Sequence, residues 1–367
     1  MSKCTPCIQK TLLALLAVLS MATGVFISYK AIHEKPKPNF EYFSSLSLTD
    51  ARTVLGLDPQ SRWIPGQAAW TEKAEHFFLL LIYVFKLMGS QNVGRGGFMF
   101  IMSMSMPIMM FTMVQSIKPD TNVLLRGVAI TLVYLLGQLI CVGAAVPLVY
   151  LPLFIFVRAM NLSKVYPDRA FGEKAPGVIK LVNMVAGAPA ILSFVIPVNH
   201  WAWMPINVVF QVFPLVFLGL SLYLFMVGPQ RSVTSSKVSV LYEDNMLMSM
   251  VIYWYSLYKL VPFLRMYRRG EPIALNDGEK LILWDSLGMF LTLIYFVLVD
   301  MIADIQLKNE TGKPLHSASP VKWILGTIKS TLMALVVGPG AVMDIYLAAR
   351  EDTATPLHAS ATVRKRQ

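Results

Sequence analysis

Carboxylic acids inside apolar stretches are the residues of this sequence that are best suited to take part in a reaction. Asp285 lies near the start of the mostly apolar run Leu281–Asp300. At about 100° per residue, Asp285, Thr292 and Phe296 share one face of a helix. Carboxylates within a bilayer are costly and are usually functional. Asp285 is therefore the candidate proton donor, while capping of its own helix or pairing with a lysine is the structural alternative.

A second carboxylate, Asp300, would lie about 22 Å from Asp285 along that helix, so the two would mark opposite ends of a cavity. Asp300 also begins an Asp-x-x-x-Asp motif with Asp304, and this spacing places two carboxylates on one face, which suits Mg²⁺ and diphosphate. Intramembrane prenyltransferases resembling the ubiquinone-pathway enzymes use two such motifs. Here the only possible second motif, Asn276–Glu279, has the wrong spacing. An intramembrane prenyltransferase stays an alternative, and no metal site is predicted.

Aromatic residues cluster in the preceding span. Trp254 and Tyr258 lie one helical turn apart, as do Tyr255 and Lys259. Tryptophan and tyrosine are enriched at membrane interfaces, so a core or interfacial belt is the simpler interpretation. The functional interpretation is that the ring faces stabilise a passing cation. Glu243, which precedes this span, would then be a possible base.

The elements that must position these residues are membrane spans. Charged residues make up 14% of the 367 residues, against about 25% in soluble domains, and the mean hydropathy is +0.57. Eight runs approach the about 20 apolar residues that a span needs, and they predict an all-α, polytopic transmembrane helical bundle of about eight spans. The runs are Thr11–Tyr29, Gly97–Gln115, Gly127–Phe156, Ile179–Ile196, Ile206–Met226, Met246–Leu264, Leu281–Asp300 and Ile324–Leu347. A weaker ninth run is His76–Met88, and Gly127–Phe156 is expected to kink at its prolines.

The expected organisation has four parts. Residues 1–30 form an N-terminal signal-anchor span, with a cleaved signal peptide as the alternative. Residues 31–75 form a polar loop with a short interfacial helix at Leu46–Leu55, residues 76–350 the transmembrane bundle, and residues 351–367 a basic polar tail. The net charge of +11 is attributed to loop lysines and arginines beside lipid headgroups rather than to a nucleic-acid partner. Membrane orientation stays open.

Four short features carry a family resemblance. They are the run from Ser105-Met106-Pro107 through Lys118-Pro119, the segment Gly143–Pro152, Trp284-Asp285 at the opening of a span, and Gly338–Asp344 followed by Arg350-Glu351. In this pattern the chain resembles the fungal membrane-bound terpene cyclases of the ascofuranone and macrophorin pathways. The resemblance implies cyclisation of a prenylated polyketide or phenol, often through a terminal epoxide, in meroterpenoid biosynthesis. It also implies an integral protein of the endoplasmic reticulum or another endomembrane.

The residues and the resemblance together predict a mechanism. A carboxyl group in a low-dielectric site can stay protonated at neutral pH, so it could protonate the epoxide or terminal alkene of a farnesyl chain. Rings would then close through carbocations held by aromatic faces. The assigned residues are Asp285 as the acid, Glu243 or Asp300 as the base, and Trp254, Tyr255, Tyr258, Trp284 and Phe296 around the cation. No diphosphate leaves, so neither a metal nor another cofactor is required; the expected partners are the prenylated substrate and the lipid bilayer.

Two other classes stay open. A small-molecule transporter would also show several spans, a few buried polar groups and broken helices such as the one expected at Gly338-Pro339-Gly340, although no internal repeat is visible. A purely structural membrane protein would make Asp285 and the aromatic cluster incidental. The sequence lacks a P-loop, a dinucleotide fingerprint, an H-E-x-x-H motif, a nucleophile elbow and zinc-type Cys/His spacing.

Overall fold

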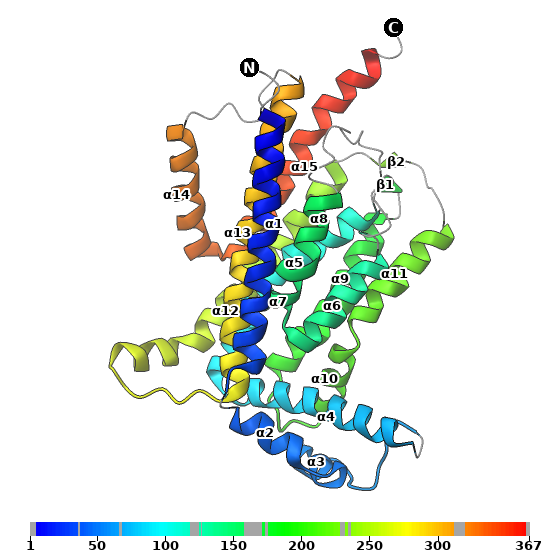
Figure 1. The fold of residues 1–367 in the computed structure, drawn as a ribbon, viewed down its shortest axis with the longest axis vertical. Helices are drawn as coiled ribbons and strands as arrows, with labels where there is room; N and C mark the ends of the chain where they lie inside the picture. The colour runs from blue at the N-terminus through cyan, green and yellow to red at the C-terminus, as the bar shows by residue number, and fades with distance from the viewer. Residues whose placement is uncertain are drawn as a thin grey trace.

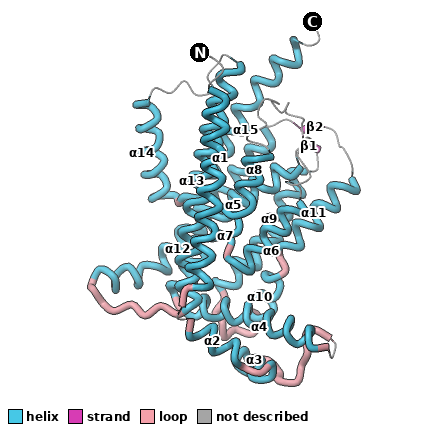
Figure 2. The backbone as a smooth tube through the Cα atoms, in the orientation of Figure 1, coloured by secondary structure: helices cyan, strands magenta, loops and turns pink. Residues whose placement is uncertain are grey.

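The fold comes from a computed structural model, which describes residues 5–35, 37–65, 68–117, 125, 127–157, 171–172, 175–227, 232–233, 236–311 and 320–364. The described residues are mainly helical (Figure 1; Figure 2). The helices are α1 (Thr5–Ser28), α2 (Pro38–Ser45), α3 (Leu48–Leu55), α4 (Ala69–Ser90), α5 (Asn92–Ile117), α6 (Gly127–Ile140), α7 (Val142–Ala145), α8 (Leu151–Val157), α9 (Ala175–Val195), α10 (Trp203–Gln211), α11 (Pro214–Val227), α12 (Ser236–Arg268), α13 (Asp277–Thr311), α14 (Pro320–Val337) and α15 (Pro339–Arg364).

Two π-helical segments and one small ladder complete the described structure. Residues Tyr29–His33 prolong α1, and Val146–Tyr150 join α7 to α8. Strands β1 (Phe171–Gly172) and β2 (Ser232–Val233) pair antiparallel over two residues each. The prediction of an all-α fold is confirmed.

Five helices of the described chain are long and apolar enough to cross a membrane. They cover Cys7–His33, Asn92–Ser116, Pro176–Val195, Val238–Arg268 and Asp277–Ile302. The chain is therefore a helical membrane protein. The predicted number of about eight spans is not confirmed, because only five of the eight apolar runs form such helices within the described residues.

The other three runs are each divided by a break in the helix. Cys141, at φ 76°, separates α6 from α7, and Gly338, at φ 96°, separates α14 from α15. A short turn at residues 212–213 separates α10 from α11. A positive φ interrupts the right-handed helix, and a residue other than glycine adopts it rarely. The run Gly127–Phe156 is thus two helical pieces that meet at Cys141, not one kinked helix.

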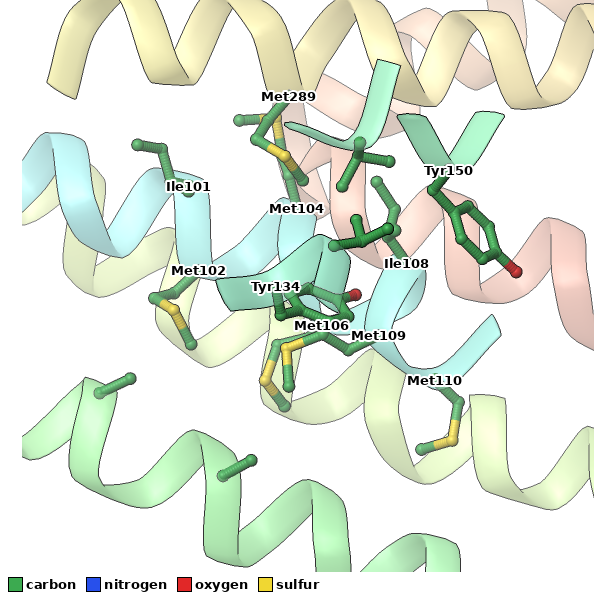
Figure 3. Packing of buried hydrophobic residues seen from close by; sticks show 14 of the residues in the cluster. Ile101, Met102, Met104, Met106, Ile108, Met109, Met110, Tyr134, Tyr150 and Met289 are labelled. Carbon is green, nitrogen blue, oxygen red and sulfur yellow. The ribbon is translucent and has the colours of Figure 1, made fainter. Parts of the chain in front are cut away.

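Helix α5 is the centre of the bundle. Of its most apolar window, 94% is buried, and α9, α12, α13 and α15 all pack against it. Its buried methionines point from the helix toward different neighbours (Figure 3). They include Met102, Met104, Met106, Met109 and Met110. Because methionine is unbranched and flexible, it fills the irregular gaps that converging helices leave.

Helices α2, α3, α4 and α10 lie at one end of the bundle, and α4 runs crosswise to α1 and α13 (Figure 1). The weak ninth run, His76–Met88, belongs to α4, which is not among the five candidate spans. The predicted short helix at Leu46–Leu55 is confirmed as α3, which begins after the N-cap Ser47 and ends at Gly56 in the left-handed region. These four helices cover one end of the long helices.

A buried ion pair fixes the loop after α3 to α4. Glu75 Oε1 accepts hydrogen bonds from Arg52 Nη2 at 2.5 Å and from the Trp63 backbone N–H at 3.2 Å, and Glu75 Oε2 accepts one from the Ile64 N–H at 3.4 Å. Burial raises the pKa of Glu75, but the hydrogen bonds from Arg52 and the two backbone N–H groups outweigh it and leave the pKa below its ordinary value. The carboxylate therefore stays charged and holds the loop.

Candidate functional site

A cavity of about 220 Å³ lies between the crosswise helix α4 and the bundle helices α5, α6, α9 and α13. One water molecule needs only about 10–15 Å³ of such space, so the cavity is much larger than a packing void. Its wall is mostly apolar and rich in rings. The aromatic lining residues are Phe40, Phe77, Phe85, Phe98, Tyr134, Phe210 and Phe213, and the polar ones include Ser105, Gln138, Cys141 and Asp285.

Asp285 is the one carboxylic acid among the described lining residues. It is 7% exposed, and its Oδ1 accepts a hydrogen bond of 2.5 Å from the backbone N–H of Gly143, in the first turn of α7. The apolar wall favours the neutral acid, because an ion loses its hydration there. The Gly143 N–H favours the carboxylate. The site thus stabilises both the neutral and the charged form of the Asp285 side chain. A group that donates a proton and later accepts one needs both forms.

A close helix crossing holds Asp285 at this place. A Cβ atom on Gly143 would lie 2.2 Å from the backbone oxygen of Asp285 and 2.7 Å from its Oδ1. A Cβ atom on Gly288 would lie 2.2 Å from the backbone oxygen of Gly143. Both distances are far below van der Waals contact, so only glycine permits α7 and α13 to approach this closely. The break at Cys141 turns the chain so that the N–H groups of α7 face the carboxyl group.

Phenylalanine rings from α4, α5, α10 and the turn after α10 form one wall of the cavity, and Phe194 of α9, which is not a lining residue, packs against this wall. The ring of Phe98 on α5 stacks on that of Phe194 on α9, with centroids 3.6 Å apart. Phe85 on α4 meets Phe210 on α10 edge to face, with centroids 5.1 Å apart, and Phe210 stacks on Phe213. Such faces carry negative electrostatic potential and attract a cation. The wall can therefore bind a hydrocarbon chain and stabilise positive charge on it.

Part of the cavity lining also lies at the outer surface of the protein. Two of its lining residues, Phe77 on α4 and Leu139 on α6, are 47% and 49% exposed. Both are apolar, as is suited to a surface that faces lipid. We therefore expect an apolar ligand to enter beside Phe77 and Leu139.

The helical face predicted from the sequence is buried as expected. Asp285, Thr292 and Phe296 are all buried in the bundle. Only Asp285 of these three lines the cavity. The Phe296 ring lies deeper, 5.1 Å from the Phe111 ring and 6.2 Å from that of Tyr150. The prediction that Phe296 belongs to the site therefore finds no support in the cavity lining.

Trp284, the neighbour of Asp285, lies on the other side of α13. Its ring meets Phe26 of α1 edge to face at 5.7 Å, and the ammonium group of Lys30 lies 5.8 Å from its centroid. These contacts attach α13 to α1. Trp284 is not among the described residues that line the cavity.

The aromatic cluster of α12 lies apart from the cavity. Trp254 is 53% exposed and Tyr258 is 70% exposed, so both rings face outward. The Lys259 ammonium group lies 5.5 Å from the Tyr255 ring and 5.3 Å from that of Tyr258. The cation next to the Tyr255 and Tyr258 rings is therefore the protein's own Lys259. The structure favours the interfacial-belt interpretation of this cluster.

The two predicted bases are also placed elsewhere. Asp300 accepts a hydrogen bond of 3.2 Å from the Tyr346 hydroxyl and pairs with Arg350 Nε at 2.7 Å. Glu243 is exposed on α12. Neither lines the cavity. The side chain of Asp304 lies outside the described residues.

The other acidic motif considered from the sequence starts a helix. Asn276 Oδ1 accepts from the Glu279 N–H, and Glu279 Oε2 accepts from the Asn276 N–H, a reciprocal capping box. Asp277 Oδ2 accepts from the Asn39 N–H at 2.7 Å and so caps α2. Across the described part of the chain, no group of three or more His, Cys, Asp or Glu side chains is arranged to hold a metal ion.

A second buried acid, Asp344 on α15, joins three helices. Its carboxylate accepts hydrogen bonds from Asn245 Nδ2 at 2.8 and 3.0 Å and from Ser249 Oγ at 2.9 Å. Asn183 Nδ2 on α9 donates to Asn245 Oδ1 at 3.0 Å. Hydrogen bonds between helices satisfy polar groups in an apolar bundle. Asp344 therefore connects α9, α12 and α15 and does not line the cavity.

The sequence did not indicate the phenylalanines of the wall, Gln138 or Cys141, and it marked Gly143 only as the start of the segment Gly143–Pro152. Each lies in an apolar run in which nothing but the fold distinguishes it from its neighbours. Comparisons with protein-family models, with curated proteins and with solved structures give no match. The function is therefore inferred from the geometry and chemistry of the site.

Proposed function

We propose that the chain is a membrane-bound terpene cyclase that closes rings in a prenylated, farnesyl-bearing phenol or polyketide. The observation that carries this proposal is the place of Asp285, a buried acid on the wall of an apolar, ring-lined cavity. A farnesyl chain is a hydrocarbon and gains free energy from burial in such a cavity. The proposed setting is meroterpenoid secondary metabolism at the endoplasmic reticulum or another endomembrane.

The proposed reaction begins with proton transfer from Asp285. Its proton passes to the epoxide oxygen, whose C–O bond opens, or to the terminal alkene, and positive charge develops on carbon. An internal alkene attacks that carbon and forms the ring bond. The faces of Phe98, Phe210 and Phe213 stabilise the moving charge. The product is an isomer of the substrate, so no metal, cofactor or leaving group takes part.

The final proton needs an acceptor within the cavity. Since Glu243 and Asp300 do not line it, the Asp285 carboxylate formed in the first step is the acceptor in this scheme. A C–H bond next to the last cation breaks, its electron pair forms an alkene, and its proton returns to Asp285. The enzyme thus regains its starting state. The apolar wall keeps away water that would trap the cation as an alcohol.

The test is an incubation of membranes that contain the full chain. The substrates are a farnesylated phenol and its terminal epoxide, and liquid chromatography with mass spectrometry follows the products. The proposal expects a new compound with the mass of the substrate. From the farnesyl chain it has a new ring and one alkene fewer, and from the epoxide it has an alcohol and a carbocycle in place of the epoxide ring. Matched membranes without the protein are the control. Recovery of only linear substrate from both compounds would count against the proposal.

The broken helix at Cys141 favours a second candidate, a small-molecule transporter. Transporters place their sites at interrupted helices, whose N–H groups face an anionic group of the substrate. Here the N–H of Gly143 donates to Asp285 instead, so a side chain of the protein itself takes the place of the anionic group of a substrate. A transporter would move a prenylated phenol across a vesicle membrane chemically unchanged, whereas a cyclase would return an isomer.

A further inference from the structure

Helix α12 is longer than a membrane is thick. Its span Val238–Arg268 has 31 residues and so measures about 46 Å, against about 30 Å for the hydrocarbon core. Only 22% of its most apolar window is buried. The end of α12 extends away from the bundle, at the lower left of Figure 1. A helix of this length crosses the core with a tilt, as α12 has in Figure 1, and we expect its exposed C-terminal end, which carries Arg265 and Arg268, at the headgroup region.

One face of this helix changes character along its length in an ordered way. Val251, Trp254, Tyr258, Arg265 and Arg268 fall within about 100° of the helix surface. The first three are 61%, 53% and 70% exposed, and the two arginines are exposed as well. The order along the face is apolar, aromatic, then basic. This is the order that a lipid meets from hydrocarbon through interface to headgroup.

The spacing along the axis agrees with that order. Arg265 lies seven residues beyond Tyr258, which is about 10 Å. The headgroup layer on each side of a bilayer is about 5–7 Å thick. Because α12 is tilted and contains Pro262, which kinks a helix, this axial distance corresponds to a smaller depth. With the Tyr258 ring at the boundary of the hydrocarbon, the guanidinium group of Arg265 then lies at the level of the phosphates.

The two arginines are available for an external anion. Among the described residues, neither Arg265 nor Arg268 forms an ion pair, whereas the next one, Arg269, pairs with Glu271 at 3.5 Å. Lys259 is directed toward the rings of Tyr255 and Tyr258 instead. Guanidinium groups bind phosphate oxygens in a bidentate manner.

We propose that Arg265 and Arg268, at the end of α12, form a binding site for the phosphate of an anionic phospholipid headgroup. The acyl chains of that lipid lie along the apolar and aromatic part of the same face. A lipid of the surrounding bilayer fits this surface better than a soluble anion, because the basic pair continues a lipid-facing stripe. The proposal does not depend on the enzymatic function.

The test measures lipid affinity with the full chain in detergent. Native mass spectrometry follows the bound fraction during titration with phosphatidylserine and, separately, with phosphatidylcholine. The variant carries Arg265→Gln with Arg268→Gln. The control carries Lys10→Gln with Lys329→Gln, which removes two exposed positive charges from α1 and α14. Inorganic phosphate forms a third arm, since it offers the same anion without a lipid.

The expected result is tighter binding of phosphatidylserine than of phosphatidylcholine to the wild type. The arginine variant should lose about 30-fold in phosphatidylserine affinity, about fivefold for each basic residue. Its loss of phosphatidylcholine affinity should be smaller, because the choline group of that lipid already neutralises the phosphate. The lysine control should stay within about twofold of the wild type. Equal affinities for the two lipids, unchanged phosphatidylserine binding in the arginine variant, or an equal loss in the control would overturn the proposal. So would arginine-dependent binding of inorganic phosphate that matches the lipid in affinity.

Discussion

Gly143→Ala should weaken the crossing that holds Asp285. The added Cβ would lie 2.2 Å from the Asp285 backbone oxygen, 2.7 Å from Asp285 Oδ1 and 2.8 Å from the Met289 backbone nitrogen. Two of these three atoms belong to the backbone of α13, so no side-chain rotation relieves the contact. Helices α7 and α13 must move apart, and the hydrogen bond from the Gly143 N–H to Asp285 lengthens or breaks.

The magnitude follows from three contributions. Overpacking costs about 1–3 kcal/mol, and loss of the hydrogen bond to the neutral acid costs about 0.5–1.5 kcal/mol. The helix preference of alanine over glycine returns about 1 kcal/mol. The net loss in the free energy of unfolding is therefore about 0.5–3.5 kcal/mol. Gly288→Ala should cause a similar loss, because its Cβ would lie 2.2 Å from the Gly143 backbone oxygen.

The assay is the apparent Tm of the purified protein in detergent. Gly177→Ala is the matched control, because a Cβ there meets nothing within 4 Å, and its Tm should equal that of the wild type or exceed it. The double variant Gly143→Ala with Gly288→Ala should lose less than the sum of the single variants, because both changes disrupt one contact. A Tm for Gly143→Ala as high as that of Gly177→Ala would refute the close crossing.

The remaining predictions concern the phenylalanine wall of the cavity, the Arg52–Glu75 ion pair and the reaction. Phe98→Leu should change product ratios several-fold, because a ring under a cation contributes about 0.5–2 kcal/mol, while Trp254→Leu should leave the chromatographic product profile unchanged. Glu75→Gln should lower the free energy of unfolding by about 3–5 kcal/mol, because Arg52 would stay buried without its partner. The pKa of Glu75 is below its ordinary value. Its contribution to the free energy of unfolding is therefore complete above about pH 4.3 and is lost as the pH falls further. Between pH 6 and pH 3 the Tm of the wild type should fall more steeply than that of Glu75→Gln. EDTA should leave turnover unchanged, and a loss that Mg²⁺ restores would favour the prenyltransferase.

Hydropathy predicted the class of the fold but not where the helices break. The run Leu281–Asp300 became the core of α13, because continuous apolar residues with no breaker leave a helix as the one structure that satisfies the backbone in lipid. The run Gly127–Phe156 looks equally continuous, yet it breaks at Cys141. Nothing in that residue type favours a positive φ. The break lies next to a close contact between α7 and α13, where Gly143 and Gly288 leave no room for a Cβ atom, and no pattern within one run reveals such a contact between distant segments.

The site was predictable where burial decides it and unpredictable where distant segments meet. Asp285 could be identified because a carboxylic acid in an apolar helix is costly wherever it lies. The phenylalanines of the wall come from α4, α5, α10 and the turn after it, and no periodicity within one helix reveals such a contact. The cluster around Trp254 was conspicuous in the sequence for a different reason, since rings of this kind also belong to the membrane interface.

The measurement that tests the central claim most directly is the cyclisation rate of Asp285→Asn. An asparagine carbonyl oxygen can still accept the hydrogen bond from the Gly143 N–H, so the crossing is preserved while the transferable proton is lost. General acid catalysis contributes about 10²–10⁴-fold. The account predicts that Asp285→Asn cyclises a farnesylated phenol or its epoxide slower by that factor and accumulates linear substrate at wild-type expression and Tm. Asp344→Asn, which changes an acid away from the cavity, should keep its rate even if it loses stability. Cyclisation by Asp285→Asn at the wild-type rate would contradict the account.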